Sequence, residues 1–247
     1  VIGGRPGTGK SAFLMGWALE TAKQRKRTVV FSLEMSTSLV AERMISREGC
    51  IDGGKLRGGQ LTAEDYQAVC AEATQLSRLP LRLDDRTRTI EGVVRALDDL
   101  AAGDGVDAVF VDYLQLLEVK RPGNSRYENL ARVSRQLKEA ALRLRVPIVA
   151  AVQVGRDCES RVPLLSDIRD SGTIEQDADN ALFLYAPRSR DEPCVLNRAN
   201  FDASTGRNQG VRYIVCSLAK QRNGGTGAFD LIFDGRHMDF CQPPECR

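Results

Sequence analysis

Residues 4–11 read Gly-Arg-Pro-Gly-Thr-Gly-Lys-Ser, which fits the pattern G-x-x-x-x-G-K-[ST] in full. Glycines let a backbone wrap closely around phosphate, and successive N–H groups then form an anion-binding nest. In such a loop the lysine supplies a positive charge to the β- and γ-phosphates, and the serine hydroxyl is a ligand for Mg²⁺. The apolar residues that follow suit a helix whose N-terminus faces the same phosphates. The motif therefore predicts a site for ATP and Mg²⁺ made by Gly4, Arg5, Pro6, Gly7, Thr8, Gly9, Lys10 and Ser11.

Downstream of this loop, apolar and β-branched runs alternate with helical stretches. The runs are continuous, as expected for a parallel sheet that is covered on both faces. Strands are predicted at residues 28–32, 108–111, 146–152, 181–184, 211–219 and 228–233. Only the Gly-rich turn Asn223-Gly-Gly-Thr-Gly227 separates the last two, so an antiparallel hairpin is expected there.

The helices are recognisable from the spacing of their apolar residues. One apolar stripe predicts a helix over residues 128–145, and its members are Leu130, Val133, Leu137, Ala141 and Leu144. A shorter helix is expected around residues 94–101, and Thr62 with Asp65 resembles a capping box that opens another. Residues 187–210 are polar and predict a long surface loop. Strands alternating with helices indicate a doubly wound α/β domain with ligands at the carboxyl ends of its strands.

Composition limits the class of protein. The chain has 247 residues, with 35 Lys and Arg against 33 Asp and Glu, so it is too balanced to be a general polyanion binder. Seven cysteines without a Cys-x-x-Cys pair, and a single histidine, argue against a zinc site and fit reduced thiols in the cytoplasm. No apolar run approaches the length of about 18 residues that a membrane span needs, and no signal peptide is visible.

Two acidic residues follow predicted strands, Glu34 after residues 28–32 and Asp112 after residues 108–111. In a parallel sheet those strand ends lie beside the phosphate loop, where two acids can divide the work. One acid orients Mg²⁺ and the other activates the attacking water. Asp112 follows the most hydrophobic strand and is assigned to the metal, which leaves Glu34 as the base. A strand-end acid that caps a turn is the alternative for each.

Three further features each allow two interpretations. Gln153 ends a predicted strand and can bond a γ-phosphate or the attacking water, or it is a solvated loop residue. Lys220 and Arg222 share one face at the end of another strand. They could reach a phosphate on a neighbouring subunit as an arginine finger does, or they are solvated strand-end cations. The polar segment 166–179, with Gly172 at an expected turn, could hold DNA phosphates through an Arg and backbone amides, or it is a surface loop.

Six stretches, taken in order, carry a family resemblance. They are Gly-Arg-Pro-Gly-Thr-Gly-Lys-Ser (4–11), Phe-Ser-Leu-Glu-Met (31–35), Val-Asp-Tyr-Leu-Gln-Leu (111–116), Ser-Arg-Gln-Leu-Lys (134–138), Ser-Asp-Ile-Arg-Asp-Ser-Gly-Thr-Ile-Glu-Gln-Asp-Ala-Asp (166–179) and Ala-Lys-Gln-Arg-Asn-Gly (219–224). The first is generic to P-loop proteins, whereas the last two are specific. Over nearly its whole length the chain resembles the RecA-like motor domain of DnaB-type replicative helicases. The resemblance implies one RecA-like P-loop NTPase domain over residues 1–247, with a mostly parallel twisted sheet, helices on both faces and a C-terminal antiparallel hairpin.

The resemblance also implies a homohexameric ring that moves 5′ to 3′ along single-stranded DNA and unwinds duplex, with ATP sites between subunits. By position it assigns Glu34 as the catalytic base, Asp112 to Mg²⁺, Gln153 as the γ-phosphate sensor, Lys220 and Arg222 as cations acting in trans, and Arg169, Asp170 and Gly172 as a DNA-gripping loop. A primase and a helicase loader are implied as further partners. We expect a cytoplasmic protein that does not bind a membrane.

The chain departs from the family pattern in three places. Val154-Gly155-Arg156 replaces the usual Leu-Asn-Arg after the sensor, the stretch from there to Ser166 is shortened, and the N-terminal primase-interaction domain and linker helix are missing. Only three residues precede the loop, fewer than the 5–6 or so of an average strand, so we expect a fragment of a longer protein. Two alternatives stay open. One is a RecA-like recombination, repair or clock-type ATPase without unwinding, and the other is a non-motor module that docks on a helicase.

Overall fold

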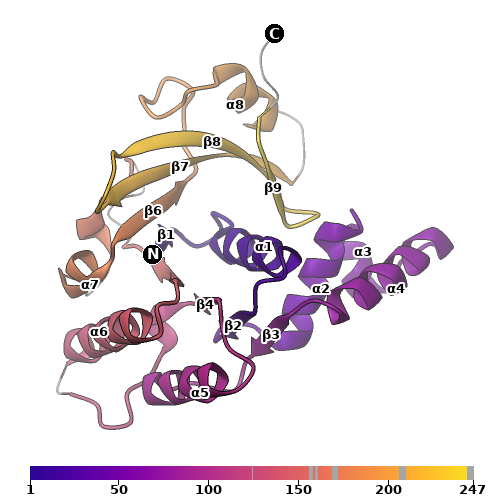
Figure 1. Cartoon of the computed structure of the whole chain (residues 1–247). Helices are drawn as coiled ribbons and strands as arrows, with labels where there is room; N and C mark the ends of the chain where they lie inside the picture. The colour runs from indigo at the N-terminus through magenta and orange to yellow at the C-terminus, as the bar shows by residue number, and fades with distance from the viewer. Residues whose placement is uncertain (124, 156–157, 159–160, 169–171, 206–209, 244–247) are drawn as a thin grey trace.

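The computed structural model describes residues 1–123, 125–155, 158, 161–168, 172–205 and 210–243 (Figure 1). The strands within this part form one nine-stranded sheet in the order β3-β2-β4-β5-β1-β6-β7-β8-β9. Their bounds are β1 Ile2–Gly4, β2 Thr28–Ser32, β3 Leu81–Asp84, β4 Ala108–Asp112, β5 Ile148–Gln153, β6 Asn180–Tyr185, β7 Val211–Gln221, β8 Gly227–Asp234 and β9 Asp239–Cys241. Strands β1–β6 pair in parallel, and β7, β8 and β9 are added antiparallel. The mostly parallel sheet and the C-terminal β7–β8 hairpin are thus confirmed.

The helices of the described part cover the two faces of the parallel strands. Their bounds are α1 Lys10–Lys23, α2 Thr37–Glu48, α3 Gly53–Gly58, α4 Ala63–Ser77, α5 Ile90–Ala102, α6 Arg126–Leu144, α7 Gly172–Asp177 and α8 Arg198–Thr205, with 3₁₀ turns η1 Leu114–Leu116 and η2 Leu165–Asp167. Helices α5 and α6 pack on one face of the sheet, and α1 and α2 pack on the other (Figure 1). No helix of the described residues is long and apolar enough to cross a membrane.

The continuous apolar character of the strands follows from these two cores. Along β4, Val109 and Val111 belong to the core under α5 and α6, whereas Ala108 and Phe110 belong to the core under α1. Successive side chains of a strand point to opposite faces, so a sheet covered twice needs an apolar residue at every position. All five residues of β4 are buried, including Asp112 at its carboxyl end.

Several sequence predictions can be compared residue by residue. Helix α6 carries the predicted stripe, because Leu130, Val133 and Leu137 are buried. Helix α4 begins with the predicted capping box, in which Thr62 and Asp65 each accept a hydrogen bond of 3.1 Å from the other's backbone N–H.

Two predictions of irregular structure were wrong. Residues 187–210 contain helix α8, whose Phe201 packs edge-on against Tyr213 of β7 with ring centroids 5.8 Å apart. This helix is short and mostly polar, so its few apolar contacts are made with a distant strand that sequence spacing does not reveal. Gly172, expected at a turn, is instead the first residue of α7. The edge strands β3 and β9 were not predicted, since each is only three or four residues long and none of their residues is buried.

Candidate functional site

The loop from Gly4 to Gly9 connects β1 to α1 and adopts a conformation that requires its glycines. Gly7 and Gly9 have φ angles of 81° and 86°, in the left-handed region that side chains with a Cβ rarely adopt. A Cβ on Gly9 would also lie 2.7 Å from the Phe240 ring of β9. The turn is closed by Thr8, whose hydroxyl donates to the carbonyl of Arg5 at 2.8 Å. The glycine pattern therefore reflects a tight loop with its backbone accessible to a ligand.

Helix α1 starts where this loop ends, and it has no side-chain cap. Gly9 is its N-cap residue, so the first N–H groups of the helix have no side-chain acceptor there and the positive end of the helix dipole faces the loop. The Lys10 ammonium donates to the carbonyl of Arg5 at 3.0 Å. Burial lowers the pKa of Lys10, and the charges of Asp112 and Glu34 oppose that shift. A partly desolvated cation at a helix N-terminus suits a phosphate group.

Asp112 is the most unusual acid of the site. It is 1% exposed, and neither carboxylate oxygen has a hydrogen-bond partner among the described residues. Burial raises the pKa of Asp112, and the Ser11 hydroxyl, which lies near the carboxylate but outside hydrogen-bond geometry, opposes the shift together with the charges of Lys10 and Arg43. A buried carboxylate without a partner is costly unless it faces a cation, so Asp112 and Ser11 fit Mg²⁺. Among the described residues there is no group of three or more His, Cys, Asp or Glu side chains that could hold a metal ion.

Glu34 and Gln153 line the same cavity of about 340 Å³ as Lys10 and Asp112. Glu34 is exposed and lies two residues beyond β2, whereas Gln153 is the last residue of β5. The Gln115 side chain holds Gln153 through both backbone groups, because it accepts from the Gln153 N–H and donates to its carbonyl, each at 3.1 Å. The structure thus brings together the four residues that the phosphate loop and the strand ends predicted. The supporting role of Gln115, which lies inside one of the recognised motifs, was missed.

Sequence reasoning also missed several other residues that line this cavity. Arg43 of α2 faces it with a buried Nε atom that has no hydrogen-bond partner among the described residues, and burial lowers the pKa of its guanidinium. Arg212 of β7 donates to the Gly7 carbonyl at 2.6 Å, and its guanidinium lies 5.4 Å from the centre of the Phe233 ring. Met238 also lines the cavity. Nothing in the local sequence distinguishes Arg43 from a solvated helix residue.

Lys220 and Arg222 lie away from the phosphate loop of their own chain. Lys220 pairs with Ala181 across β6 and β7, whereas Gly4 pairs with Leu184, three residues further along β6. The two cations are therefore at the other end of these strands. Lys220 donates through Nζ to the Glu175 carbonyl at 2.6 Å, and Arg222 forms an ion pair of 2.8 Å with Asp179. Both reach one segment, residues 175–179, as side chains at a spacing of two should.

The predicted DNA-binding residues are only partly placed. Arg169 and Asp170 lie outside the described residues, as does Arg156. Gly172 is the first residue of α7, where a Cβ would lie 3.5 Å from the Tyr127 hydroxyl of α6. Helix α7 is fixed beside α6, because the Ser134 hydroxyl donates to Asp177 at 2.7 Å.

Comparison with known proteins gives consistent matches. Residues 1–242 match the family described as DnaB-like helicase C terminal domain. The replicative DNA helicase DnaB of Treponema pallidum (strain Nichols) is 36% identical over 250 residues, which cover 99% of this chain and 52% of that protein. Two solved structures align with a TM-score of 0.83 and 28% identity over 98% of this chain. One is described as an ATPase domain, of which 83% is covered, and the other is a DnaB-like replicative helicase described with its interactions with primase, of which 58% is covered.

The chain spans about half the length of the relatives it matches. The two structural neighbours share its RecA-like architecture, with helices on both faces of a mostly parallel sheet. The family match begins before the phosphate loop and ends beyond β9, so it includes every residue of the cavity described above. The chain therefore belongs to the family of DnaB-like helicase C-terminal domains.

Proposed function

We propose that residues 1–247 are the single ATP-hydrolysing motor domain of a replicative DNA helicase, which moves 5′ to 3′ on single-stranded DNA and unwinds duplex. The observation that carries the proposal is one cavity that joins the phosphate loop, Lys10, Glu34 and the unpartnered Asp112. The family membership of the chain supports it. We expect the protein to work in the cytoplasm.

In this proposal the loop from Gly4 to Ser11 binds the phosphates of ATP through its backbone N–H groups and Lys10. Ser11 and Asp112 would hold Mg²⁺, which would supply neutralisation of the negative charge on the phosphates. Glu34 is exposed and can accept a proton from the attacking water, the role of a general base. Gln153, held by Gln115, is placed to bond the γ-phosphate or that water.

Lys220 and Arg222 act on a neighbouring copy. Their place at the other end of β6 and β7 supports this role, since the register puts them at the strand ends opposite the phosphate loop of their own chain. The Arg222 side chain is 54% exposed and so can meet a partner surface. Stabilising the transferring phosphoryl group from a second subunit makes hydrolysis depend on the interface, and a homohexameric ring supplies that interface.

Single-stranded DNA binds the segment 166–179, with Arg169, Asp170 and Gly172 at the backbone phosphates. The position of Gly172 at the start of α7, and the anchoring of α7 to α6, support this proposal. Contacts of this kind position a strand without reading its bases. A primase and a helicase loader are the further partners that we propose. A DnaB-like helicase of similar fold is described with its interactions with primase.

Three measurements test the proposal. Glu34→Gln should keep ATP binding and abolish turnover, because the amide cannot take the proton; undiminished hydrolysis would refute the assignment of the base. An unwinding assay on a forked duplex with the full-length protein separates a helicase from a RecA-like recombination, repair or clock-type ATPase, which would hydrolyse ATP without separating the strands. DNA-stimulated turnover would exclude a non-motor module that docks on a helicase.

A further inference from the structure

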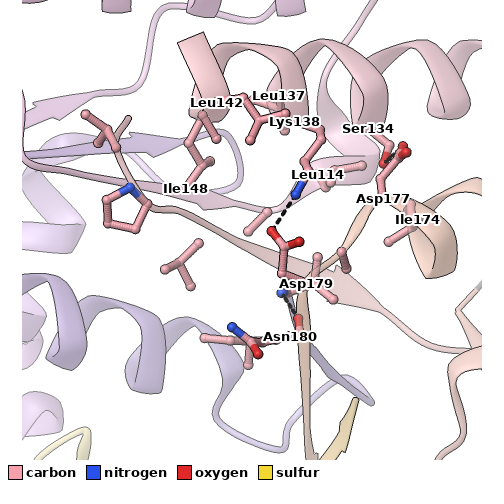
Figure 2. A pocket seen from close by; sticks show the side chains of 18 of the residues that line it. Leu114, Ser134, Leu137, Lys138, Leu142, Ile148, Ile174, Asp177, Asp179 and Asn180 are labelled. Carbon is pink, nitrogen blue, oxygen red and sulfur yellow. Dashed lines mark hydrogen bonds and ion pairs between the residues drawn. The ribbon is translucent and has the colours of Figure 1, made fainter. Parts of the chain in front are cut away.

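Asp179 lies between α7 and β6, directly below α6. Asp179 is one of the residues that line a cavity of about 460 Å³. Figure 2 shows the Lys138 side chain of α6 pointing toward the Asp179 carboxylate. Lys138 and Asp179 form an ion pair through Nζ and Oδ2. Around them the cavity is lined by apolar side chains, among them Leu137 and Ile148. Through this ion pair, the Asp179 carboxylate is held by α6, a nineteen-residue helix that packs on the core.

The second oxygen of the same carboxylate holds Arg222. The Arg222 Nη1 atom is 2.8 Å from Asp179 Oδ1, and the backbone N–H of Arg222 donates to the Asp179 carbonyl at 2.9 Å. The Lys138 hydrogen bond lowers the pKa of Asp179, and the charges of Lys138 and Arg222 add to this against the effect of burial. Asp179 therefore remains a carboxylate at neutral pH and pairs with both cations at once.

The side chains of the two cations that pair with Asp179 differ in solvent exposure. The Lys138 side chain is 21% exposed, whereas that of Arg222 is 54% exposed and lies beyond the end of β7. A guanidinium has five N–H donors, and only Nη1 is engaged by Asp179, so the remaining donors can reach a group outside the chain. An unrestrained arginine side chain loses conformational entropy when it binds a ligand. A hydrogen bond that already holds one side of the guanidinium reduces that loss.

We propose that Asp179 is a positioning residue, which takes its own place from Lys138 and holds Arg222 ready for the phosphate of ATP on a neighbouring subunit. This inference rests on the proposed trans role of Arg222. Helix α7 is connected to the same set of contacts, because Lys220 donates to the Glu175 carbonyl in the last turn of that helix. A movement of α7 is then passed to both interface cations.

A matched surface pair in the same chain provides the control. Asp98 of α5 pairs with Arg143 of α6, and the two side chains are 42% and 51% exposed, against 47% and 54% for Asp179 and Arg222. Neither Asp98 nor Arg143 lines the nucleotide cavity. A general effect of losing an exposed Asp–Arg pair should therefore be equal at the two places.

The test measures steady-state ATP hydrolysis by the full-length protein with single-stranded DNA. Asp179→Asn should lower kcat two- to fivefold with KM for ATP within twofold, while Asp98→Asn leaves both unchanged. A two- to fivefold change corresponds to about 0.4–1 kcal/mol, the range expected of an exposed ion pair. In the Arg222→Ala background, Asp179→Asn should cause no further loss, because the residue through which it acts is gone.

Three results would overturn the inference: an unchanged kcat in Asp179→Asn, an equal loss in Asp98→Asn, or a loss that adds to that of Arg222→Ala. Lys138→Met provides a second route if Asp179→Asn folds poorly, since it removes the anchor and should reproduce the fall in kcat. A kcat unaffected by Lys138→Met in a folded protein would count against the inference as well. Full activity of Arg222→Ala itself would instead refute the trans role in the proposed function.

Discussion

Replacing Asp112 by asparagine should stabilise the ligand-free protein and at the same time remove its response to Mg²⁺ and nucleotide. Asp112 is 1% exposed, and both of its oxygens lack a hydrogen-bond partner among the described residues. An unsatisfied buried polar group costs about 1–3 kcal/mol, and more when it is charged. The amide of asparagine keeps polar atoms in the same place but loses the charge, so we expect a net gain of about 1–2 kcal/mol.

The pH dependence has a definite sign. Burial raises the pKa of Asp112 in the folded protein, so the folded state holds its proton at pH values where the unfolded chain has lost it. The contribution of Asp112 to stability is therefore greatest below the ordinary carboxyl pKa and is lost as pH rises through the raised value. Above that value wild type carries a buried charge that Asp112→Asn lacks, and the gain of the variant should be largest there.

Thermal unfolding measures both effects. A gain of about 1–2 kcal/mol in a chain of this size raises Tm by roughly 2–8 °C. With Mg²⁺ and a non-hydrolysable ATP analogue at about 100 times Kd, wild type should gain about 2.7 kcal/mol, whereas Asp112→Asn should gain little when metal is present. The order of the two melting temperatures should thus reverse. Asp99→Asn, at an exposed position on α5, serves as the control.

Two results would refute this reasoning. If Asp112→Asn melts below wild type without ligand, the carboxylate makes a stabilising contact that outweighs its burial. If the variant keeps the full Mg²⁺-dependent stabilisation by nucleotide, Asp112 does not contribute to the metal site. In either case the Asp99→Asn control must melt within about 2 °C of wild type, since exposed substitutions change stability by less than about 0.5 kcal/mol.

Three other outcomes are expected. Gly9→Ala should weaken ATP binding and lower the free energy of unfolding by about 1–3 kcal/mol. A φ of 86° is strained for alanine, and the added Cβ would contact the Phe240 ring. Unchanged urea unfolding and unchanged nucleotide affinity would contradict this. Arg222→Ala subunits mixed into wild-type rings should inhibit ATP hydrolysis beyond their own share, and strictly proportional loss would exclude action in trans. Arg169→Ala should weaken single-stranded DNA binding for all sequences and reduce the salt slope by about 0.7, whereas an unaltered slope would remove it from the phosphate contacts.

The parts of the site that could be predicted are those that local order determines. The loop from Gly4 to Ser11 is contiguous, and Glu34, Asp112 and Gln153 follow strands whose carboxyl ends must meet in a parallel sheet. Continuous apolar runs identified these strands because each is buried on both faces.

The residues that sequence could not reveal depend on distant pairing. Arg212 reaches the phosphate loop only because β7 lies two strands from β1, and nothing near Arg212 in the sequence indicates that neighbour. Arg43 occupies a helix face that also suits solvent. Helix α8 was missed for a related reason, since Phe201 packs with Tyr213 and Val215 of the distant strand β7. Resemblance to a family implied an interface role for Lys220 and Arg222, and the register of β6 and β7 supports that proposal by placing them at the strand ends opposite the phosphate loop.

That register also restricts how copies of the chain can assemble. The phosphate loop follows β1 and the cation pair ends β7, on either side of β6 and at opposite ends of it. In the proposed trans arrangement, each copy therefore offers a phosphate site at one end and two cations at the other. Two copies related by a two-fold axis present the same patch to each other and cannot easily fill both sites, whereas a heterologous, head-to-tail contact fills one site per interface. If the cations act in trans as proposed, an open row of copies leaves one site incomplete, whereas a closed ring completes every site. Turnover per subunit, measured against the number of subunits, should therefore rise abruptly when the ring closes, and a flat dependence would contradict this arrangement.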